Sequence, residues 1–260
     1  MDRTLEILAD LTRQAGAAIM TTRAQGFTVT RKADQSPLTE ADLASNRVIA
    51  QGLAEHFPDI PVVSEETPLP PHEERAAWPR FFLVDPLDGT KEFIKDNGEF
   101  CVCLALIEAG RATLGAVYVP VQDALYAGGP GLGAFVQRSG GSLTAIRAQG
   151  PDPDQGLVVV GSRSHPDPRL DAYLEGLFVR ERLTAGSALK FCMVAEGRAH
   201  LYPRFNPTSE WDTAAGQAVV EGAGGRFTTL DGRPFRYNKP DIVNPGFLVQ
   251  AQGLNLPFPA

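Results

Sequence analysis

The chain has 260 residues, enough for one large domain or two ordinary domains with a sizeable core. Its formal net charge of −7 lacks the basic balance typical of nucleic-acid-binding proteins and disfavours a main role in binding anionic membranes. An acidic protein that handles an anionic substrate needs metal ions or a local basic pocket.

Two amphipathic helices are predicted near the N-terminus. Leucine and alanine residues at helical spacing predict a helix from Leu5 to about Thr22. After a polar loop or irregular strand, Thr39 precedes an acidic first turn, as is typical of a helix start. A second helix is therefore expected from Thr39, its N-cap, towards Pro58.

The next part of the chain predicts a sheet. Apolar runs at residues 60–64 and 81–84 each end in acidic residues, and a proline-rich exposed connection is expected between them. Residues 101–107 and 112–119 flank a short turn and predict an antiparallel hairpin. Short strands at residues 125–126 and 134–136 are expected to extend the same sheet.

The pattern changes after residues 149–155, a proline-containing stretch that we interpret as a linker. Strands and helices then alternate: strands are predicted at residues 157–160, 200–202 and 247–249, and helices at residues 168–177, 187–196 and 213–221. We expect an α+β domain over residues 1–150 and a smaller α/β domain over residues 151–260.

The strongest chemical signal is the sequence Asp85-Pro86-Leu87-Asp88-Gly89-Thr90. It predicts a stiff turn that carries two carboxylates, whose mutual repulsion raises a pKa unless a cation lies between them. Mg²⁺ with oxygen ligands meets that need, and the predicted helix start after Gly89 offers N–H groups to a phosphate. The same residue types also occur in ordinary exposed turns.

Two further acidic positions strengthen the metal hypothesis. Glu65 and Glu66 follow the strand at residues 60–64, and Asp212 follows Trp211 at the start of a predicted helix. Three acidic ends of strands and helices are what a multi-metal site is built from. For Asp212 the alternative is an ordinary helix N-cap, which is compatible with metal binding through one oxygen.

These motifs, together with Thr213-Ala214-Ala215 and Glu221-Gly222-Ala223-Gly224-Gly225, resemble the inositol monophosphatase superfamily of Mg²⁺-dependent phosphatases. The resemblance runs from about residue 32 to residue 225 and implies that family's layered αβαβα sandwich.

Within the superfamily, the chain is most similar to the bacterial 3'(2'),5'-bisphosphate nucleotidases of the CysQ type. Three stretches carry this narrower resemblance, residues 32–42, 186–192 and 201–205. In inositol phosphatases, a glutamate that recognises sugar hydroxyls lies seven residues before the tryptophan-linked aspartate. This chain has Phe205 there, which suits a base or an apolar wall better than a polyol.

The resemblance implies a site with two Mg²⁺ ions. Glu65, Asp85 and the Leu87 carbonyl are implied to bind one ion, and Asp85, Asp88 and Asp212 the other, with Asp85 as the bridge. The metal ions then activate water for an in-line attack on a phosphate monoester, without a phosphoenzyme.

The resemblance also implies catalytic residues: Thr90 and its partner Asp42 orient and deprotonate the attacking water, together with Glu65. A third, weaker Mg²⁺ is implied near Glu65 and Asp42. The substrate phosphate is implied to contact a set of residues around the metal ions: Glu65, Leu87, Asp88, Gly89, Thr90 and Asp212.

On the nucleotide side, the resemblance implies contacts from Ser162, His165, Gly186, Ser187 and Lys190. A lysine suits a second, dianionic phosphate as a point charge. The alternatives are a loop or capping role for His165 and a solvated helix position for Lys190.

Two arginine residues add weaker candidates on the same side. Arg163 could assist in binding the nucleotide, and Arg204 is either a contact or an ordinary surface residue.

The expected function is therefore hydrolysis of the 3'-phosphate of adenosine 3',5'-bisphosphate to AMP, with the sulfated nucleotide as a further substrate. Inositol-1-phosphatase or fructose-1,6-bisphosphatase activity is the alternative within the superfamily, and a non-catalytic nucleotide- or metal-binding regulator is the alternative outside it.

The small-molecule nucleotide bisphosphate is the expected partner, with no nucleic acid. Cys101, Cys103 and Cys192 do not suggest a disulfide framework, and no signal core or membrane-spanning segment is predicted. A cytoplasmic protein is expected. Association with the inner face of the membrane, and the choice between monomer and homodimer, stay open.

Overall fold

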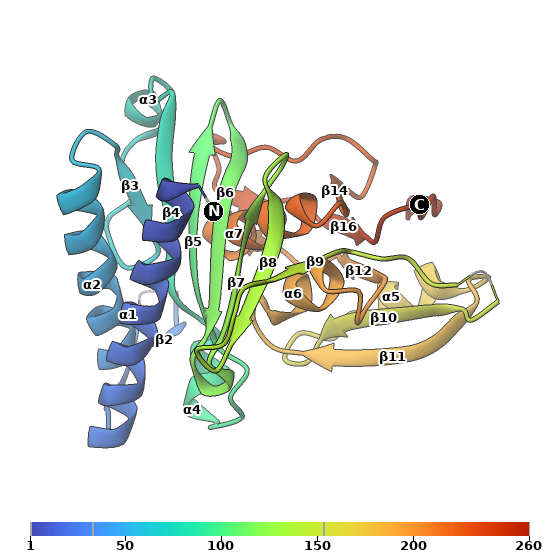
Figure 1. Ribbon diagram of the computed structural model, residues 1–260, viewed down its shortest axis with the longest axis horizontal. Helices are drawn as coiled ribbons and strands as arrows, with labels where there is room; N and C mark the ends of the chain where they lie inside the picture. Colours follow the sequence, from blue (N-terminus) through green and yellow to red (C-terminus); the bar gives the residue numbers. More distant parts are fainter. Residues whose placement is uncertain (1, 33, 153, 260) are drawn as a thin grey trace.

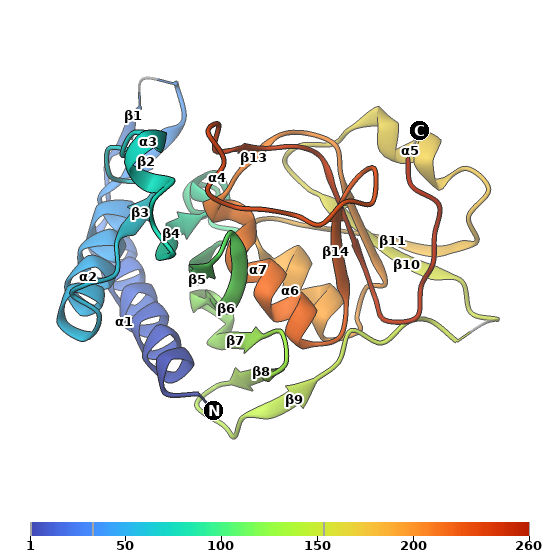
Figure 2. The same ribbon diagram turned by 90° about the horizontal axis from the view of Figure 1, so that it is seen from above.

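The computed structural model describes residues 2–32, 34–152 and 154–259, and arranges them in five layers. In Figure 2 two helices cover a large sheet, two more helices follow, and a second sheet with a last helix completes the stack. The helices are α1 Arg3–Gln25, α2 Glu40–His56, α3 His72–Arg75, α4 Thr90–Ile94, α5 Pro168–Leu174, α6 Leu189–Ala195 and α7 Trp211–Gly222. The expected αβαβα sandwich is confirmed.

The larger sheet has seven strands among the described residues, in chain order: β3 Val62–Ser64, β4 Arg80–Asp88, β5 Cys101–Glu108, β6 Arg111–Val119, β7 Ala124–Gly129, β8 Gly133–Arg138 and β9 Thr144–Ile146. Only β3 and β4 pair in parallel, and each later neighbour is antiparallel. The predicted hairpin of β5 and β6 and its extension by β7 and β8 are confirmed. A 3₁₀ turn, Pro120–Gln122, joins β6 to β7.

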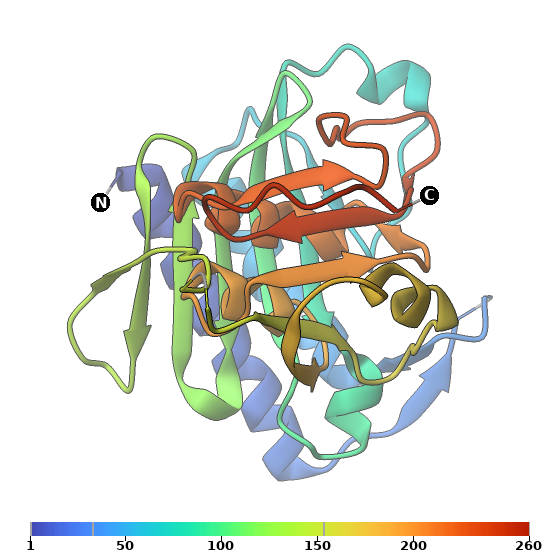
Figure 3. The same cartoon turned by 90° about the vertical axis from the view of Figure 1, so that its right-hand side faces the viewer.

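The second sheet has the order β11-β10-β12-β16-β14 and lies at the end of the molecule opposite helices α1 and α2 (Figure 1). Its strands are β10 Leu157–Ser162, β11 Val179–Ala185, β12 Leu201–Arg204, β14 Arg226–Thr229 and β16 Phe247–Gln250. Two small ribbons pair β1 Val29–Arg31 with β2 Pro37–Thr39, and β13 Thr208–Ser209 with β15 Val243–Asn244. Figure 3 shows the second sheet from the side that α5 covers.

The layers are held by separate apolar clusters. Helices α1 and α2 bury Leu8, Leu53 and their neighbours against one face of the larger sheet, where Phe82 is fully buried. Helices α6 and α7 fill the space between the two sheets, and Phe191 stacks on Phe227 and Phe247 of the second sheet. Helix α7 packs directly on the larger sheet. Gly115 allows this close approach, since a Cβ at this position would lie 2.4 Å from the Ala215 carbonyl oxygen.

Local signals placed most helices correctly, and tertiary contacts account for the differences. Helix α2 begins as expected, with Thr39 as N-cap in a capping box that Asp42 completes. The connection after residue 68, which was expected to be exposed, contains the short helix α3. Its Arg75 is buried, and the guanidinium donates hydrogen bonds to Pro70, Asn238 and Lys239. The edge strands β11 and β14 were not predicted, because their alternation of polar and apolar residues is weak.

The proposed division into residues 1–150 and 151–260 stays a prediction. The linker assigned to residues 149–155 includes Pro153, which lies outside the described residues, as does Ala33 in the first stretch of the family resemblance.

Candidate metal centre and active site

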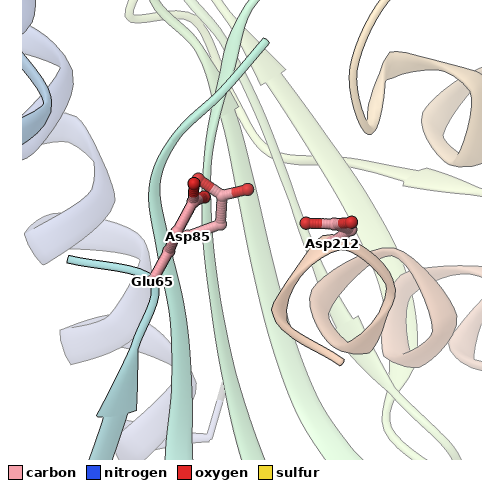
Figure 4. A group of neighbouring side chains, drawn as sticks. All are labelled: Glu65, Asp85 and Asp212. Carbon is pink, nitrogen blue, oxygen red and sulfur yellow. The ribbon is translucent and has the colours of Figure 1, made fainter. Parts of the chain in front are cut away.

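Three carboxylates from distant parts of the chain meet at one point (Figure 4). Oxygen atoms of Glu65, Asp85 and Asp212 lie within 4.8 Å of one another. Glu65 follows β3, Asp85 lies in β4, and Asp212 lies in the first turn of α7. Asp85 is buried and the other two are half-buried, so the group has access to solvent from one side.

An irregularity in β4 brings both aspartates of the Asp85–Asp88 motif to the same side of the sheet. Asp85 pairs with Cys103 and Asp88 with Cys101, so two residues of β4 lie opposite one residue of β5. Residues three apart in a regular strand point to opposite faces, whereas this bulge restores the same face. The stiff turn predicted after the strand is thus a bulge within the end of β4.

Neighbouring groups hold the bulge in place. Ser45 of α2 donates a buried hydrogen bond of 2.6 Å to the Pro86 carbonyl, and the Leu87 N–H donates one of 3.1 Å to Asp85. The Leu87 carbonyl accepts a longer bond of 3.4 Å from the Thr90 hydroxyl. The backbone that carries the two aspartates is therefore anchored from both sides.

The crowded carboxylates repel one another and resist ionisation. Burial, followed by the charges of Glu65 and Asp88, raises the pKa of Asp85 well above its usual range. Burial and Asp88 raise the pKa of Asp212 to about 8. Such a group of oxygen donors, short of compensating positive charge, suits a divalent cation with oxygen ligands.

Asp88 lies beside the three clustered carboxylates but is held by the opposite half of the protein. Its Oδ2 accepts a hydrogen bond of 2.6 Å from the backbone N–H of Ala188, just before α6. Burial raises the pKa of Asp88 to about 6, although the charge of Lys190 and this hydrogen bond oppose the shift. The expected metal ligands therefore converge, with Asp88 turned partly towards α6.

Thr90 and Asp42 form the predicted pair. The Thr90 hydroxyl donates a 3.1 Å hydrogen bond to Asp42 Oδ1, and Thr90 is the first residue of α4, with Gly89 as N-cap at φ 95°. Burial raises the pKa of Asp42, while hydrogen bonds from Thr39 and Thr90 favour its ionised form. Asp42 itself lies behind Thr90 and does not line the cleft.

A cleft of about 300 Å³ joins this centre to the second half of the protein. All the residues of the predicted site except Asp42 line it: Glu65, Asp85, Leu87, Asp88, Gly89, Thr90, Ser162, His165, Gly186, Ser187, Lys190 and Asp212. The cleft is thus lined both by the carboxylates of this centre, which we call its acidic end, and by the cationic side chains of Lys190 and Arg204.

Lys190 is buried at the cleft wall, so the alternative of a solvated helix lysine is wrong. Only 4% of the residue is exposed, and its ammonium donates to the carbonyls of Ala185 (3.2 Å) and Ser187 (2.5 Å). Burial lowers the pKa of Lys190 to about 8, although the charge of Asp88 opposes this shift. Its ammonium also lies 5.5 Å from the centre of the Tyr202 ring.

Among the residues around the rim, His165 lines the cleft as expected, whereas Arg163 and Phe205 do not line it. His165 is exposed at the rim, 3.3 Å from the Lys91 ammonium, and burial and Lys91 lower its pKa. Arg163 does not line the cleft, because it pairs with Glu99 at 2.7 Å. Phe205 also lies outside it, in a neighbouring hollow of about 240 Å³ that shares Ser162, His165 and Arg204 with the cleft.

The sequence is matched over residues 1–255 by the model of the inositol monophosphatase family. The chain belongs to the inositol monophosphatase family. It is 47% identical over 248 residues to the 3'(2'),5'-bisphosphate nucleotidase CysQ of Escherichia coli K12, covering 94% of this chain and 98% of the relative. The CysQ of Buchnera aphidicola from Acyrthosiphon pisum is 42% identical over 253 residues, covering 95% of this chain and 93% of the relative.

Solved structures of the inositol monophosphatase family share the fold. CysQ from Bacteroides thetaiotaomicron superposes with a TM-score of 0.81 at 36% identity, covering 96% of this chain and 97% of that one. An inositol monophosphatase from Anabaena gives a TM-score of 0.75 at 26% identity, covering 96% and 90%. Within the described residues of this family member, every helix is too short or too polar to span a membrane.

Two residues of this inositol monophosphatase family member acquire roles that the motifs did not suggest. Lys32 forms ion pairs with Glu65 (2.7 Å) and Glu66 (2.6 Å).

The buried Glu210 accepts from the backbone N–H groups of Asn238 and Lys239, which fixes the start of α7. Glu210 is also the N-cap of α7, so the alternative role of Asp212 as N-cap is wrong. Asp212 accepts instead from the Ser209 N–H at 2.7 Å.

Proposed function

We propose that the protein is a Mg²⁺-dependent phosphomonoesterase that hydrolyses the 3'-phosphate of adenosine 3',5'-bisphosphate, releasing AMP and phosphate. The sulfated form of this nucleotide is a second substrate in the proposal. The CysQ relatives, which are named for a bisphosphate nucleotidase activity, cover nearly the whole chain and support the assignment. The observation that carries it is that one cleft is lined by both a carboxylate cluster and a buried lysine.

The acidic end is suited to two Mg²⁺ ions. In the proposal, Glu65, Asp85 and the Leu87 carbonyl would hold one ion, and Asp85, Asp88 and Asp212 would hold the other. Mg²⁺ commonly takes one or two carboxylates, with water and substrate phosphate as the remaining ligands. Asp88 accepts from the Ala188 N–H through Oδ2, and its other oxygen, Oδ1, would serve as the ligand. A third, weaker ion near Glu65 and Asp42 is also part of the proposal.

The reaction is an attack of water on phosphorus, with the alcohol as the leaving group. Bound metal ions lower the pKa of the attacking water and neutralise charge that builds up on the phosphate. Thr90 orients that water and takes up its proton as the proton of the Thr90 hydroxyl passes to the Asp42 carboxylate, which accepts a hydrogen bond from that hydroxyl. The N–H groups of Gly89 and Thr90, at the beginning of α4, donate to the phosphate oxygens.

The other end of the cleft binds the remainder of the nucleotide. Lys190 is placed as a point charge for the second phosphate, since two of its three N–H donors contact backbone carbonyls and the third is available. Ser162, His165, Gly186 and Ser187 line the same end and complete the proposed contacts.

A substrate panel tests the proposal. Purified protein is assayed for phosphate release from adenosine 3',5'-bisphosphate, inositol 1-phosphate and fructose 1,6-bisphosphate, each with Mg²⁺ and with a chelator. We expect the nucleotide to give the highest kcat/KM and the chelator to abolish all release. Faster turnover of either sugar ester overturns the nucleotide assignment. Nucleotide binding without any Mg²⁺-dependent release supports a non-catalytic regulator instead.

A further inference from the structure

An ion pair outside the cleft connects the two halves of the protein. Glu99 precedes β5 of the larger sheet, and Arg163 follows β10 of the second sheet. The guanidinium binds the carboxylate in a two-pronged arrangement, with Nε to Oε2 at 2.7 Å and Nη2 to Oε1 at 2.8 Å. Neither residue lines the cleft.

The same carboxylate also holds a backbone segment that does line the cleft. Glu99 Oε2 accepts a 2.8 Å hydrogen bond from the N–H of Gly186, and Arg163 Nη2 donates one of 2.9 Å to the Thr184 carbonyl. Burial disfavours ionisation of Glu99, but the hydrogen bonds from Arg163 and Gly186 outweigh it and lower the pKa of the carboxyl. Glu99 is therefore an anion at neutral pH, with charge-assisted hydrogen bonds to both.

Gly186 approaches the neighbouring segment too closely for any side chain. A Cβ at this position would lie 2.7 Å from Cγ of Glu92 and 2.9 Å from the Glu99 carbonyl oxygen. Residues 184–188 comprise the last two residues of β11 and the three residues before α6, and we call them the α6 entry loop. This loop is thus in direct contact with the backbone of Glu99.

The α6 entry loop supplies several contacts to the site. Its Ala188 N–H binds the Asp88 carboxylate, and its Ala185 and Ser187 carbonyls accept from the Lys190 ammonium. A displacement of this loop would move the ammonium relative to the metal ligands. The distance between the two ends of the cleft therefore depends on where the loop rests against Glu99.

We propose that Glu99 is a positioning residue that holds the α6 entry loop in a fixed position relative to the carboxylates of β4, and so sets the placement of the second phosphate. This inference rests on the proposed function, since it assumes a substrate with two phosphates. A contribution to stability alone is expected to be small, because the Arg163 side chain is 47% exposed and such pairs contribute little. The effect of Glu99 lies in geometry, where Gly186 N–H needs an acceptor.

Glu99→Met tests the proposal, because methionine keeps the length of the side chain and removes the acceptor. We expect KM for adenosine 3',5'-bisphosphate to rise about tenfold, as for the loss of one hydrogen bond to a charged group. For p-nitrophenyl phosphate, which has a single phosphate, kcat and KM should stay within about threefold, a smaller change than the tenfold loss. Glu99→Gln retains an acceptor for Gly186 and should restore most of the affinity.

Paired variants separate positioning from simple ion pairing. Exchanging the charges, Glu99→Arg together with Arg163→Glu, restores opposite charges but leaves Gly186 without its acceptor, so KM should stay high. Arg163→Met keeps that acceptor and should raise KM less than Glu99→Met. Asp231→Ala is the matched control, because it breaks an exposed arginine–carboxylate pair with Arg233 far from the cleft and should leave KM unchanged.

Three outcomes overturn the proposal: unchanged KM in Glu99→Met, equal loss on both substrates, or recovery of KM in the charge exchange. If the unaltered protein does not hydrolyse the bisphosphate, the proposed function fails separately. Hydrogen exchange then tests positioning, since Glu99→Met should speed amide exchange in residues 184–190 at least several-fold, and unchanged exchange overturns it. The same measurement applies to Arg163→Met if Glu99→Met does not fold.

Discussion

Asp42 uses its two carboxylate oxygens for different purposes, and one of them holds Thr90. Oδ1 accepts the Thr90 hydroxyl at 3.1 Å, while Oδ2 accepts the Thr39 N–H at 2.8 Å and the Thr39 hydroxyl at 2.6 Å. The capping box that begins α2 therefore also orients the carboxylate towards Thr90. A local sequence signal for a helix start and a contact to a proposed catalytic residue coincide in one side chain.

Asp42→Asn should lower kcat by about 100-fold with little change in KM, because the amide cannot accept the proton in the reaction. The start of α2 should persist, since Thr39 remains its N-cap and the amide oxygen of an asparagine can still accept from the Thr39 N–H. Phosphate release and thermal unfolding measure the two effects. Glu55→Gln, on the exposed side of α2, is the control and should keep full activity. A kcat within threefold of the unaltered protein contradicts the role of Asp42.

The metal-free protein should lose stability between about pH 4, close to the usual pKa of an aspartate, and about pH 8. Asp88 and Asp212 have raised pKa values, to about 6 and about 8, so their contribution is present at low pH and is lost as the pH rises through those values. A fall in Tm on the order of 5 °C is expected by calorimetry, and saturating Mg²⁺ should remove it.

Asp212→Asn is the control for this pH dependence. The variant lacks one of the titrating carboxylates, so its metal-free Tm should fall less over the same range of pH. Identical slopes with and without Mg²⁺ would show that the raised pKa values are not linked to metal binding.

Lys190 should impose a limit on activity at alkaline pH. Burial lowers the pKa of Lys190 to about 8, so the side chain carries a positive charge below this pH and loses it as the pH rises above this value. The kcat/KM for the bisphosphate should therefore fall above about pH 8, while that for p-nitrophenyl phosphate should not. Lys190→Arg keeps the charge and should remove this alkaline limit.

Lys190→Ala provides the complementary measurement. KM for the bisphosphate should rise at least tenfold, as is expected when a charged hydrogen-bonding group is removed, with kcat less affected. Equal losses on the bisphosphate and the simple monoester would instead assign Lys190 a structural role.

Gly186→Ala should damage the α6 entry loop, because its Cβ would lie 2.9 Å from the Glu99 carbonyl oxygen, a backbone atom that cannot easily move. Overpacking of this kind costs about 1–3 kcal/mol, so we expect a Tm lower by several degrees and a raised KM for the bisphosphate. Gly26→Ala is the comparison, since it strains a residue at φ 84° with open space around it and should leave KM unchanged. An unaltered KM in Gly186→Ala contradicts the close fit.

Sequence patterns predicted much of this molecule correctly. The spacing of leucine residues located α1, and the acidic ends of apolar runs located Glu65, Asp85 and Asp88, because these signals are local. Asp212 was found in the same way, as an acid at the start of a predicted helix, and the resemblance to the inositol monophosphatase family added its place among the metal ligands. Twelve of the thirteen predicted site residues line the cleft.

Other features could not be predicted, because they depend on contacts between distant segments. Arg163 looked like a ligand contact and is paired with Glu99, 64 residues away in the chain. Lys190 was predicted to contact the nucleotide, with a solvated helix position as the alternative, and only the enclosure of α6 between two sheets shows that it is buried. Short edge strands such as β11 carry too little pattern of their own.

By itself, the sequence determined which chemistry is present: the carboxylates, the helix starts and the turn-forming residues, all properties of neighbouring residues. Tertiary structure alone decided where the side chains point. A single extra residue in β4 turns Asp88 to the same face as Asp85, and the packing of α7 brings Asp212 to within reach of Glu65. The physical reason is that strand register and layer packing minimise the free energy of the whole chain, and no local pattern contains those contacts.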